Sequence, residues 1–345
     1  MAPNAASRPL PAPWSTQVIE ALPLAPVWFG VGVAAAVLAV YFGVEFVSGD
    51  VAQALEGDQH LTMHFRITLI NALMLGFLPT AQVYLSRWTH LHLDQLRPLL
   101  GAPTELRHDP LTTPARRAAG MVGCVTLMAL FLVIPNPTLP LTRRYWIFEH
   151  AWDWVLLAPI GWLAGRLMYA MTRDSLYFSR LATRIEQIDL LDSSPLLPFV
   201  SQGLKSAMLV VILLSLFMGL VGVLVISPAA SVITTLAMVG VATLALLLPV
   251  RGAHLRIRDA KRAKLDAVRT QIRAAESAAM RPDADGVRAA ARLPGLLALE
   301  GRIREVREWP FDTPSLARFA LYVTLGVGSW LGAAAVERLL DLVLA

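Results

Sequence analysis

Charged residues and cysteine are scarce in this sequence, and each shortage excludes a class of protein. Only 16% of the 345 residues are charged, whereas a soluble domain carries about 25%. The single cysteine, Cys124, rules out an intrachain disulfide framework and a cluster of thiolate metal ligands. A phosphate-binding loop, a nucleophile elbow and an HExxH zinc motif are missing too. The common signatures of soluble enzymes are therefore not found.

Long apolar runs dominate the sequence instead. Hydrophobic residues make up 56% of the chain, and seven runs have about the twenty residues that a helix needs to cross a bilayer core of about 30 Å. The runs do not alternate between apolar and polar residues, as the strands of a transmembrane barrel do. We therefore predict an all-α, multi-pass transmembrane bundle. The predicted spans are 26–47, 67–85, 118–134, 152–171, 204–226, 231–250 and 316–339.

Arginine and lysine are distributed unevenly among the loops, which predicts the orientation. Three loops hold five, four and fourteen of these residues, and the loops that alternate with them hold none, two and none. The basic loops are 86–117, 172–205 and 251–308, and the others are 48–65, 135–151 and 227–231. Because cytoplasmic loops are enriched in positive charge, the N-terminus should lie inside and the C-terminus outside. Only 3 of the 30 basic residues are lysines, a composition typical of a GC-rich bacterial genome, so we predict a bacterial inner-membrane protein.

Four segments follow from this plan. Residues 1–25, rich in Pro, Ala and Ser, should form a disordered or interfacial tail. Residues 26–250 should form a six-span bundle, 251–310 a basic cytoplasmic hairpin, and 311–345 the seventh transmembrane helix.

The hairpin is predicted from two apolar stripes separated by the turn "RPDADG" at 281–286. Leu265, Val268, Ile272, Ala275 and Ala279 step by three and four residues, as in a short coiled coil. Residues 251–308 contain 14 basic and 8 acidic residues but no aromatic residue, so nucleic acid is not expected as a ligand. The excess charge suits a cytoplasmic protein partner or the anionic surface of the lipid bilayer.

The stretch "EWPFDTPSLARF", 308–319, leads from this hairpin into the last span. Asp312 or Thr313 can cap the helix, and Trp309 suits the membrane interface. A membrane-entry motif explains the whole stretch, and a gating hinge is the alternative.

A metal site is one candidate for chemistry. Glu56, His60 and His64 are spaced four apart, so a helix would place them on one face, and these residue types bind Zn, Mn or Fe. The three ligands would climb about 12 Å along the axis, so one ion needs a pair of them and a ligand from elsewhere. A solvated loop helix is the alternative. No other cofactor is expected.

Polar residues inside the predicted spans are the candidates for a pore or for polar packing. Asn71 and Gln82 lie in the second span and Arg166 in the fourth, where Arg166 is close enough to the inner edge to snorkel. The stretch "THLHLDQL", 89–96, follows the second span and is interpreted as polar membrane interface.

Small residues predict close helix packing in two further spans. Gly328 and Gly332 form a GxxxG pair, and Gly219 and Gly222 mark the fifth span. Such contacts form either within one chain or between the subunits of a homo-oligomer.

We predict a channel- or permease-like protein of unknown substrate, with two alternatives, a sensor or scaffold and a membrane enzyme. A channel or permease fits the intramembrane polar groups, and a polar cavity through the bundle would favour it. A non-transporting sensor or scaffold, whose hairpin binds a cytoplasmic protein, would have a solid apolar interior. A membrane enzyme would use the outer cluster of histidine and acidic residues.

Overall fold

The computed structural model describes residues 19, 21, 25–48, 59–100, 114–133, 148–185, 189–190, 194–224 and 228–344. Within these residues the chain is helical and contains no strand, as the sequence predicted. The long helices are α2 (Pro26–Ser48), α4 (Gln59–Leu96), α5 (Pro114–Val133), α6 (Phe148–Ala182), α7 (Leu197–Leu224), α8 (Pro228–Ala279), α9 (Ala284–Glu305) and α10 (Thr313–Leu344). Two short 3₁₀ helices, η1 (Arg97–Leu100) and η2 (Ser194–Leu196), extend α4 and precede α7.

Five of the described helices are long and apolar enough to cross a membrane. They are Pro26–Val47, Phe65–Leu100, Trp152–Ala182, Ser194–Leu220 and Thr235–Ala279. The predicted spans at 118–134 and 316–339 overlap α5 and α10, which are not among the five. Large apolar side chains such as Phe46, Val122 and Leu236 are exposed on the outside of the bundle. An apolar exterior of this kind is suited to lipid.

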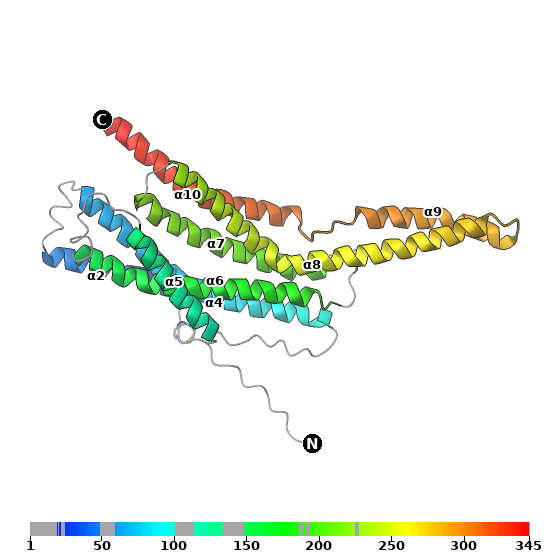
Figure 1. Ribbon diagram of the computed structural model, residues 1–345, viewed down its shortest axis with the longest axis horizontal. Coiled ribbons are helices and arrows are strands. Elements are labelled where there is room, and N and C mark those ends of the chain that lie inside the picture. The colour runs from blue at the N-terminus through cyan, green and yellow to red at the C-terminus, as the bar shows by residue number, and fades with distance from the viewer. Residues whose placement is uncertain are drawn as a thin grey trace, which may run out of the picture.

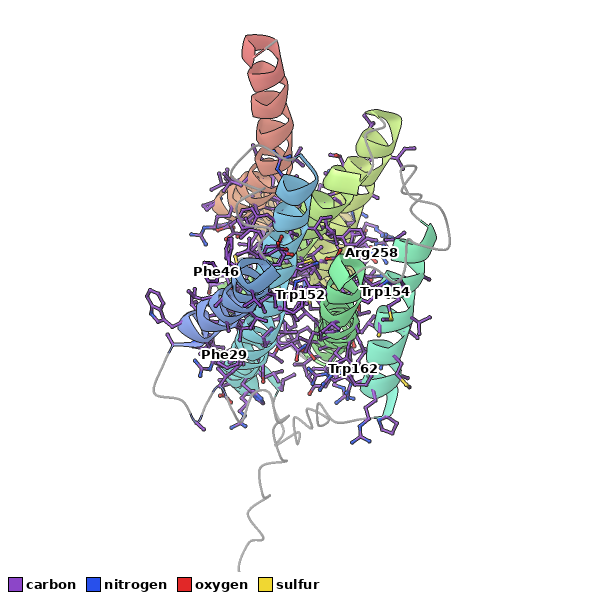
Figure 2. The ribbon with its side chains drawn as sticks, turned by 90° about the vertical axis from the view of Figure 1, so that its left-hand side faces the viewer. Phe29, Phe46, Trp152, Trp154, Trp162 and Arg258 are labelled. Carbon is purple, nitrogen blue, oxygen red and sulfur yellow. The ribbon has the colours of Figure 1, made fainter. Side chains whose placement is uncertain are left out.

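The bundle is built around α4, α6, α7 and α8 (Figure 1). Around these four, α2 packs on α4, α5 on α6, and α10 on α7. Figure 2, viewed along the bundle from the end opposite α9, shows α5 and α2 on opposite flanks. Leu78, Ile160 and Leu167 are fully buried in the central apolar cluster, to which α7 adds Leu209 and Leu213.

A second apolar cluster forms at the end of the bundle where α4 and α6 finish and α7 begins. Leu96, Phe178 and Phe199 come from these three helices, and Ile257 of α8 and Ile303 of α9 pack with them. This cluster joins the base of the α8–α9 hairpin to the membrane bundle.

Helix α8 is longer than the sequence suggested. We predicted a span ending at residue 250 and a hairpin beginning at 251, but the structure has one helix of 52 residues, which contains Pro249 and runs through this boundary. At a rise of about 1.5 Å per residue this helix is roughly 78 Å long, more than twice the thickness of a bilayer core. The composition of α8 changes from apolar to charged where its surroundings change. The helix itself is not interrupted at that point.

Helix α9 runs back along α8 after the turn at 280–283, and α10 follows in the same direction (Figure 1). Asp283 caps α9 by accepting a hydrogen bond from the Gly286 amide at 2.7 Å. The Asp312 carboxylate accepts a hydrogen bond from the Ser315 amide at 3.0 Å, which confirms the predicted cap of α10. The Ser315 side chain and then its amide lower the pKa of Asp312, because their hydrogen bonds stabilise the ionised carboxylate.

Candidate functional site

A chain of buried polar side chains crosses the bundle close to the second apolar cluster. Thr89 and His92 project from α4, Asp174 from α6, and Gln202 and Lys205 from α7. Four of the five are almost fully buried, and Lys205 is partly exposed. Burial of a polar group costs free energy unless the group is hydrogen-bonded. The hydrogen bonds among these five side chains therefore decide whether they stabilise the protein.

The hydrogen bonds among these five side chains run in one direction, from the Lys205 ammonium to the Asp174 carboxylate. The Gln202 side-chain oxygen can only accept, so His92 Nδ1 donates to it, at 2.8 Å. His92 Nε2 is then free to accept from the Lys205 ammonium, at 3.3 Å. We call Lys205, His92, Gln202, Thr89 and Asp174 the inner polar chain.

The second half of the inner polar chain ends at the carboxylate. Gln202 Nε2 donates to Thr89 Oγ1 at 3.4 Å, and Thr89 donates to Asp174 Oδ2 at 2.9 Å. The three inner members, His92, Gln202 and Thr89, therefore each accept from one neighbour and donate to the next, an arrangement in which the bonds polarise one another. The chain ties α4, α6 and α7 together and balances one positive charge with one negative charge.

Two further contacts extend this polar region. Lys205 lies over the ring of Trp88, with Nζ 5.0 Å from the ring centroid, a favourable cation–π position. The second contact joins α5 to α4: Arg116 of α5 donates to the Gln82 side-chain oxygen at 3.3 Å. Gln82 in turn donates to the Leu163 carbonyl of α6 at 3.1 Å. Helix α5 is thereby linked to α4 as well as to α6.

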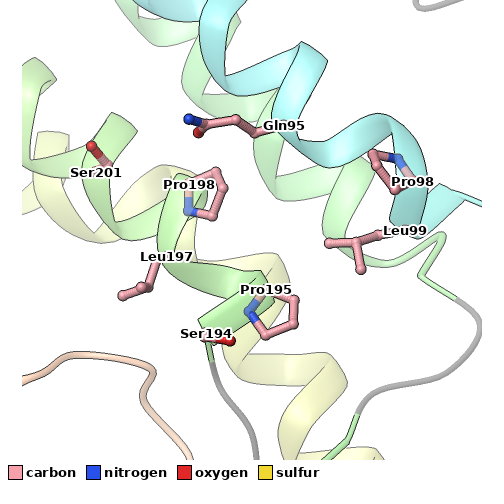
Figure 3. A pocket seen from close by; sticks show the side chains of 8 residues that line it. All are labelled: Gln95, Pro98, Leu99, Ser194, Pro195, Leu197, Pro198 and Ser201. Atoms are coloured by element: carbon pink, nitrogen blue, oxygen red, sulfur yellow. The ribbon is translucent and has the colours of Figure 1, made fainter.

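An open cleft of about 460 Å³ adjoins the inner polar chain (Figure 3). It lies between the end of α4 with η1 and the start of α7 with η2. Two of its lining residues, Gln95 and Ser201, lie one helical turn from His92 and Lys205, which do not line the cleft themselves. The lining residues are Gln95, Pro98, Leu99, Ser194, Pro195, Leu197, Pro198 and Ser201.

The predicted metal ligands fall at the start of α4 and before it. Glu56 lies outside the described residues. Helix α4 begins at Gln59, so His60 and His64 are one turn apart on a helix, but their side chains are not described. Within the described residues no group of three His, Cys, Asp or Glu side chains could hold a metal ion. The metal site therefore stays a prediction.

The three polar residues of the predicted spans lie in three different environments. Asn71 is 0% exposed, and neither its amide nitrogen nor its amide oxygen has a hydrogen-bond partner. Gln82 belongs to the contact with Arg116. Arg166 is 7% exposed, and its guanidinium carbon is 6.0 Å from the centroid of the Trp162 ring. No hydrogen bond among the described residues brings these three side chains together.

The predicted packing glycines are less crowded than others in the described chain. A Cβ at Gly219 would lie 3.3 Å from Ile70 Cδ1, but a Cβ at Gly328 would meet nothing within 4 Å. Gly222 and Gly332 lie in α7 and α10, and their surroundings are not described.

A close helix contact joins α5 to α6 through glycines that we did not predict. A Cβ at Gly123 would lie 2.8 Å from Gly165 Cα and closer still to the Gly161 carbonyl oxygen. A similar contact between Gly30 and Gly76 holds α2 against α4. Gly161 and Gly165 form a GxxxG pair, so inspection of the fourth span could have found one side of the α5–α6 contact.

The inner polar chain was also missed, and the interface interpretation of residues 89–96 is wrong for two of them. His90 and Asp94 are exposed as expected, but Thr89 and His92 are buried. Helix positions could have indicated this burial, because residues one or two helical turns apart lie on the same face. By that spacing, Thr89 and His92 continue the face of α4 that carries Gln82. We had grouped the stretch by composition and not by face.

Comparison of the chain with models of protein families, with curated proteins and with solved structures finds no match. Its function must therefore be argued from its own residues.

Proposed function

We propose that the chain is a multi-pass protein of a bacterial inner membrane with seven spans, its N-terminus inside and its C-terminus outside. The five apolar helices are joined in this proposal by α5 and α10. Met121 and Val125 on α5 and Leu321 and Leu325 on α10 are exposed, as lipid-facing residues would be. The three basic loops then share the cytoplasmic side, as the positive-inside rule requires.

Within that plan, we propose a non-transporting sensor or scaffold whose bundle positions the α8–α9 hairpin for a cytoplasmic protein partner. The observation that carries this proposal is the attachment of the end of α9 to α8. Lys261 Nζ donates to the Arg304 carbonyl at 2.8 Å and to the Val306 carbonyl at 2.7 Å. His254 stacks on Trp309 at 4.1 Å between ring centroids. The return segment is thus fixed to the helix from which the hairpin starts.

This attachment supports mechanical coupling between the membrane and the hairpin. Helix α8 enters the hairpin without a break, and α10, which follows the fixed segment, packs on α7. A shift of α8 relative to α7 would therefore move the hairpin as a unit. The fully buried Leu78, Ile160 and Leu167 fill the centre of the bundle, a packing that favours a sensor or scaffold over a pore.

The orientation is tested by labelling a single introduced cysteine. Met280, at the tip of the hairpin, is 82% exposed and can be changed to cysteine in a Cys124→Ser background. A membrane-impermeant maleimide should label this variant in inside-out vesicles and leave it unlabelled in intact spheroplasts. Labelling in the spheroplasts would refute the proposed orientation.

The coupling is tested with a matched pair of lysine variants in the full-length chain. Lys261→Met removes both bonds to the end of α9, so amide exchange at 303–309 should accelerate and a crosslinker at the exposed Val287 should lose its protein adduct in cells. Lys264→Met changes an exposed lysine one turn away and should alter neither result. Equal behaviour of the two variants, or adducts with lipid alone, would contradict the proposal.

A channel or permease is the second candidate, and one observation favours it. The fully buried and unpartnered Asn71 lies on the same face of α4 as Gln82, Thr89 and His92, so a polar path could form if the apolar centre opened. Flux of potassium, protons or chloride into proteoliposomes, abolished by Asn71→Leu, would establish this function. Flux no greater than in protein-free vesicles is the result that we expect.

A further inference from the structure

We propose that Arg116, Arg117 and Arg166 bind the phosphate group of an anionic phospholipid at the start of α5. The proposal rests first on Arg166. This side chain is 7% exposed, its Nε has no hydrogen-bond partner, and no described residue forms an ion pair with it. A buried guanidinium without an anion is costly, so a site of this kind is expected to hold an anionic group from outside the chain.

The surroundings of Arg166 add positive charge. The close α5–α6 contact brings the start of α5 to this part of α6, and Arg117 lies near enough to repel the Arg166 guanidinium. Arg116, which is buried, is repelled by Arg166 and Arg173 and attracted by Asp174. Two arginines also lie in the first turn of α5, where the positive end of the helix dipole disfavours a cation. A bound anion would stabilise this placement.

The position of the cluster fits a lipid headgroup. Helix α5 has 20 residues and is therefore about 30 Å long, which matches the hydrocarbon core of a bilayer. Its first turn then lies at the level of the headgroup phosphates. Arg117 is exposed there, whereas Arg116 and Arg166 are buried behind it, so a phosphate entering from the lipid would meet Arg117 first.

Glycine makes the room for the deeper side chain. A Cβ at Gly120 would lie 3.1 Å from Arg166 Cγ and 3.0 Å from the Trp162 ring, so a larger residue would press on both. Arginine suits the proposed ligand, because its planar guanidinium can donate two parallel hydrogen bonds to phosphate oxygens. A free phosphate ion has the same chemistry, and the experiment has to separate the two sources.

The experiment measures lipid binding by the delipidated full-length chain. Native mass spectrometry would count bound phosphatidylglycerol in competition with phosphatidylcholine, and thermal shifts would be recorded with each lipid and with inorganic phosphate. The wild type should retain phosphatidylglycerol selectively and gain stability from it. Loss of a charge-assisted contact in Arg166→Gln should weaken that binding about tenfold or more.

Two further variants keep the result interpretable. Arg288→Gln, which changes an exposed hairpin arginine, should bind phosphatidylglycerol as the wild type does. Arg166→Lys should bind it with intermediate affinity, because lysine keeps the positive charge but lacks the planar guanidinium. Equal binding by wild type and Arg166→Gln would overturn the proposal. A stabilisation by inorganic phosphate as large as that by phosphatidylglycerol would overturn the lipid assignment.

Discussion

The contact between α5 and α6 allows a steric prediction with an internal control. In Gly123→Ala, the new methyl group would lie 2.8 Å from Gly165 Cα and 2.9 Å from the Gly165 nitrogen. Carbon atoms pack best at about 3.5–4.0 Å, so α5 has to move away from α6 by about 1 Å. Overpacking of this size costs about 1–3 kcal/mol.

The control is Gly240→Ala on α8, where the added methyl would meet nothing within 4 Å. Alanine also raises helix propensity by about 0.8–1 kcal/mol over glycine in water, but this gain is common to both variants and cancels in their difference. The difference in stability between them therefore isolates the steric cost.

Thermal unfolding of the purified protein in detergent measures this difference. Each kcal/mol shifts the Tm of a protein of 150–250 residues by about 2–4 °C and that of a chain of 345 residues by less, so Gly123→Ala should unfold a few degrees below Gly240→Ala. If the two variants unfold at the same temperature, the backbone contact at Gly123 does not hold α5 in place. The α5–α6 contact would then not position the arginine cluster either.

Two predictions concern hydrogen bonds. Gln202→Leu leaves the buried His92 Nδ1 without its acceptor and Thr89 Oγ1 without its donor, and should destabilise the bundle by about 1–3 kcal/mol. Ser206→Ala, which removes a buried and unpartnered hydroxyl one turn further on, should be neutral in the same thermal assay. In the hairpin, a hydrogen bond from Arg269 at 2.9 Å lowers the pKa of Glu300. A lowered carboxylate pKa gives stability that is present above the unfolded value of about 4.3 and lost as the pH falls through the folded value. The protection of the hairpin amides, measured as their exchange rate relative to the intrinsic rate at each pH, should therefore stay constant between pH 7 and pH 5 and fall below about pH 4, and this loss of protection should be smaller in Glu300→Gln.

The helices themselves were predictable because their signals are local. Apolar runs of sufficient length, the turn at 281–286 and the cap at Asp312 can each be recognised within a short window of sequence. The unbroken α8 was not predicted, because the apolar run ends near Pro249 while the helix continues. Hydropathy reports the surroundings of a helix, and a helix can pass from one environment into another.

The inner polar chain was not predictable in the same way, because its members are far apart in sequence. Thr89, Asp174 and Gln202 lie on three helices, and no spacing rule connects them. The α5–α6 contact is an intermediate case. Gly161 and Gly165 mark a face that permits close approach, but the sequence does not say which helix approaches it.

The polar and apolar contacts together support the proposed coupling, in which the bundle would move its hairpin as one body. The inner polar chain fixes α4, α6 and α7 to one another at one end, and Phe178, which packs edge-on against both His92 and Phe199, joins that end to the second apolar cluster. Ile257 and Ile303 bring the base of the hairpin into the same cluster. At the centre of the bundle the helices are held by apolar side chains, which impose less directional preference than hydrogen bonds do. Relative motion of the helices should therefore be easier away from the inner polar chain, and its rigid end should carry that motion to the hairpin.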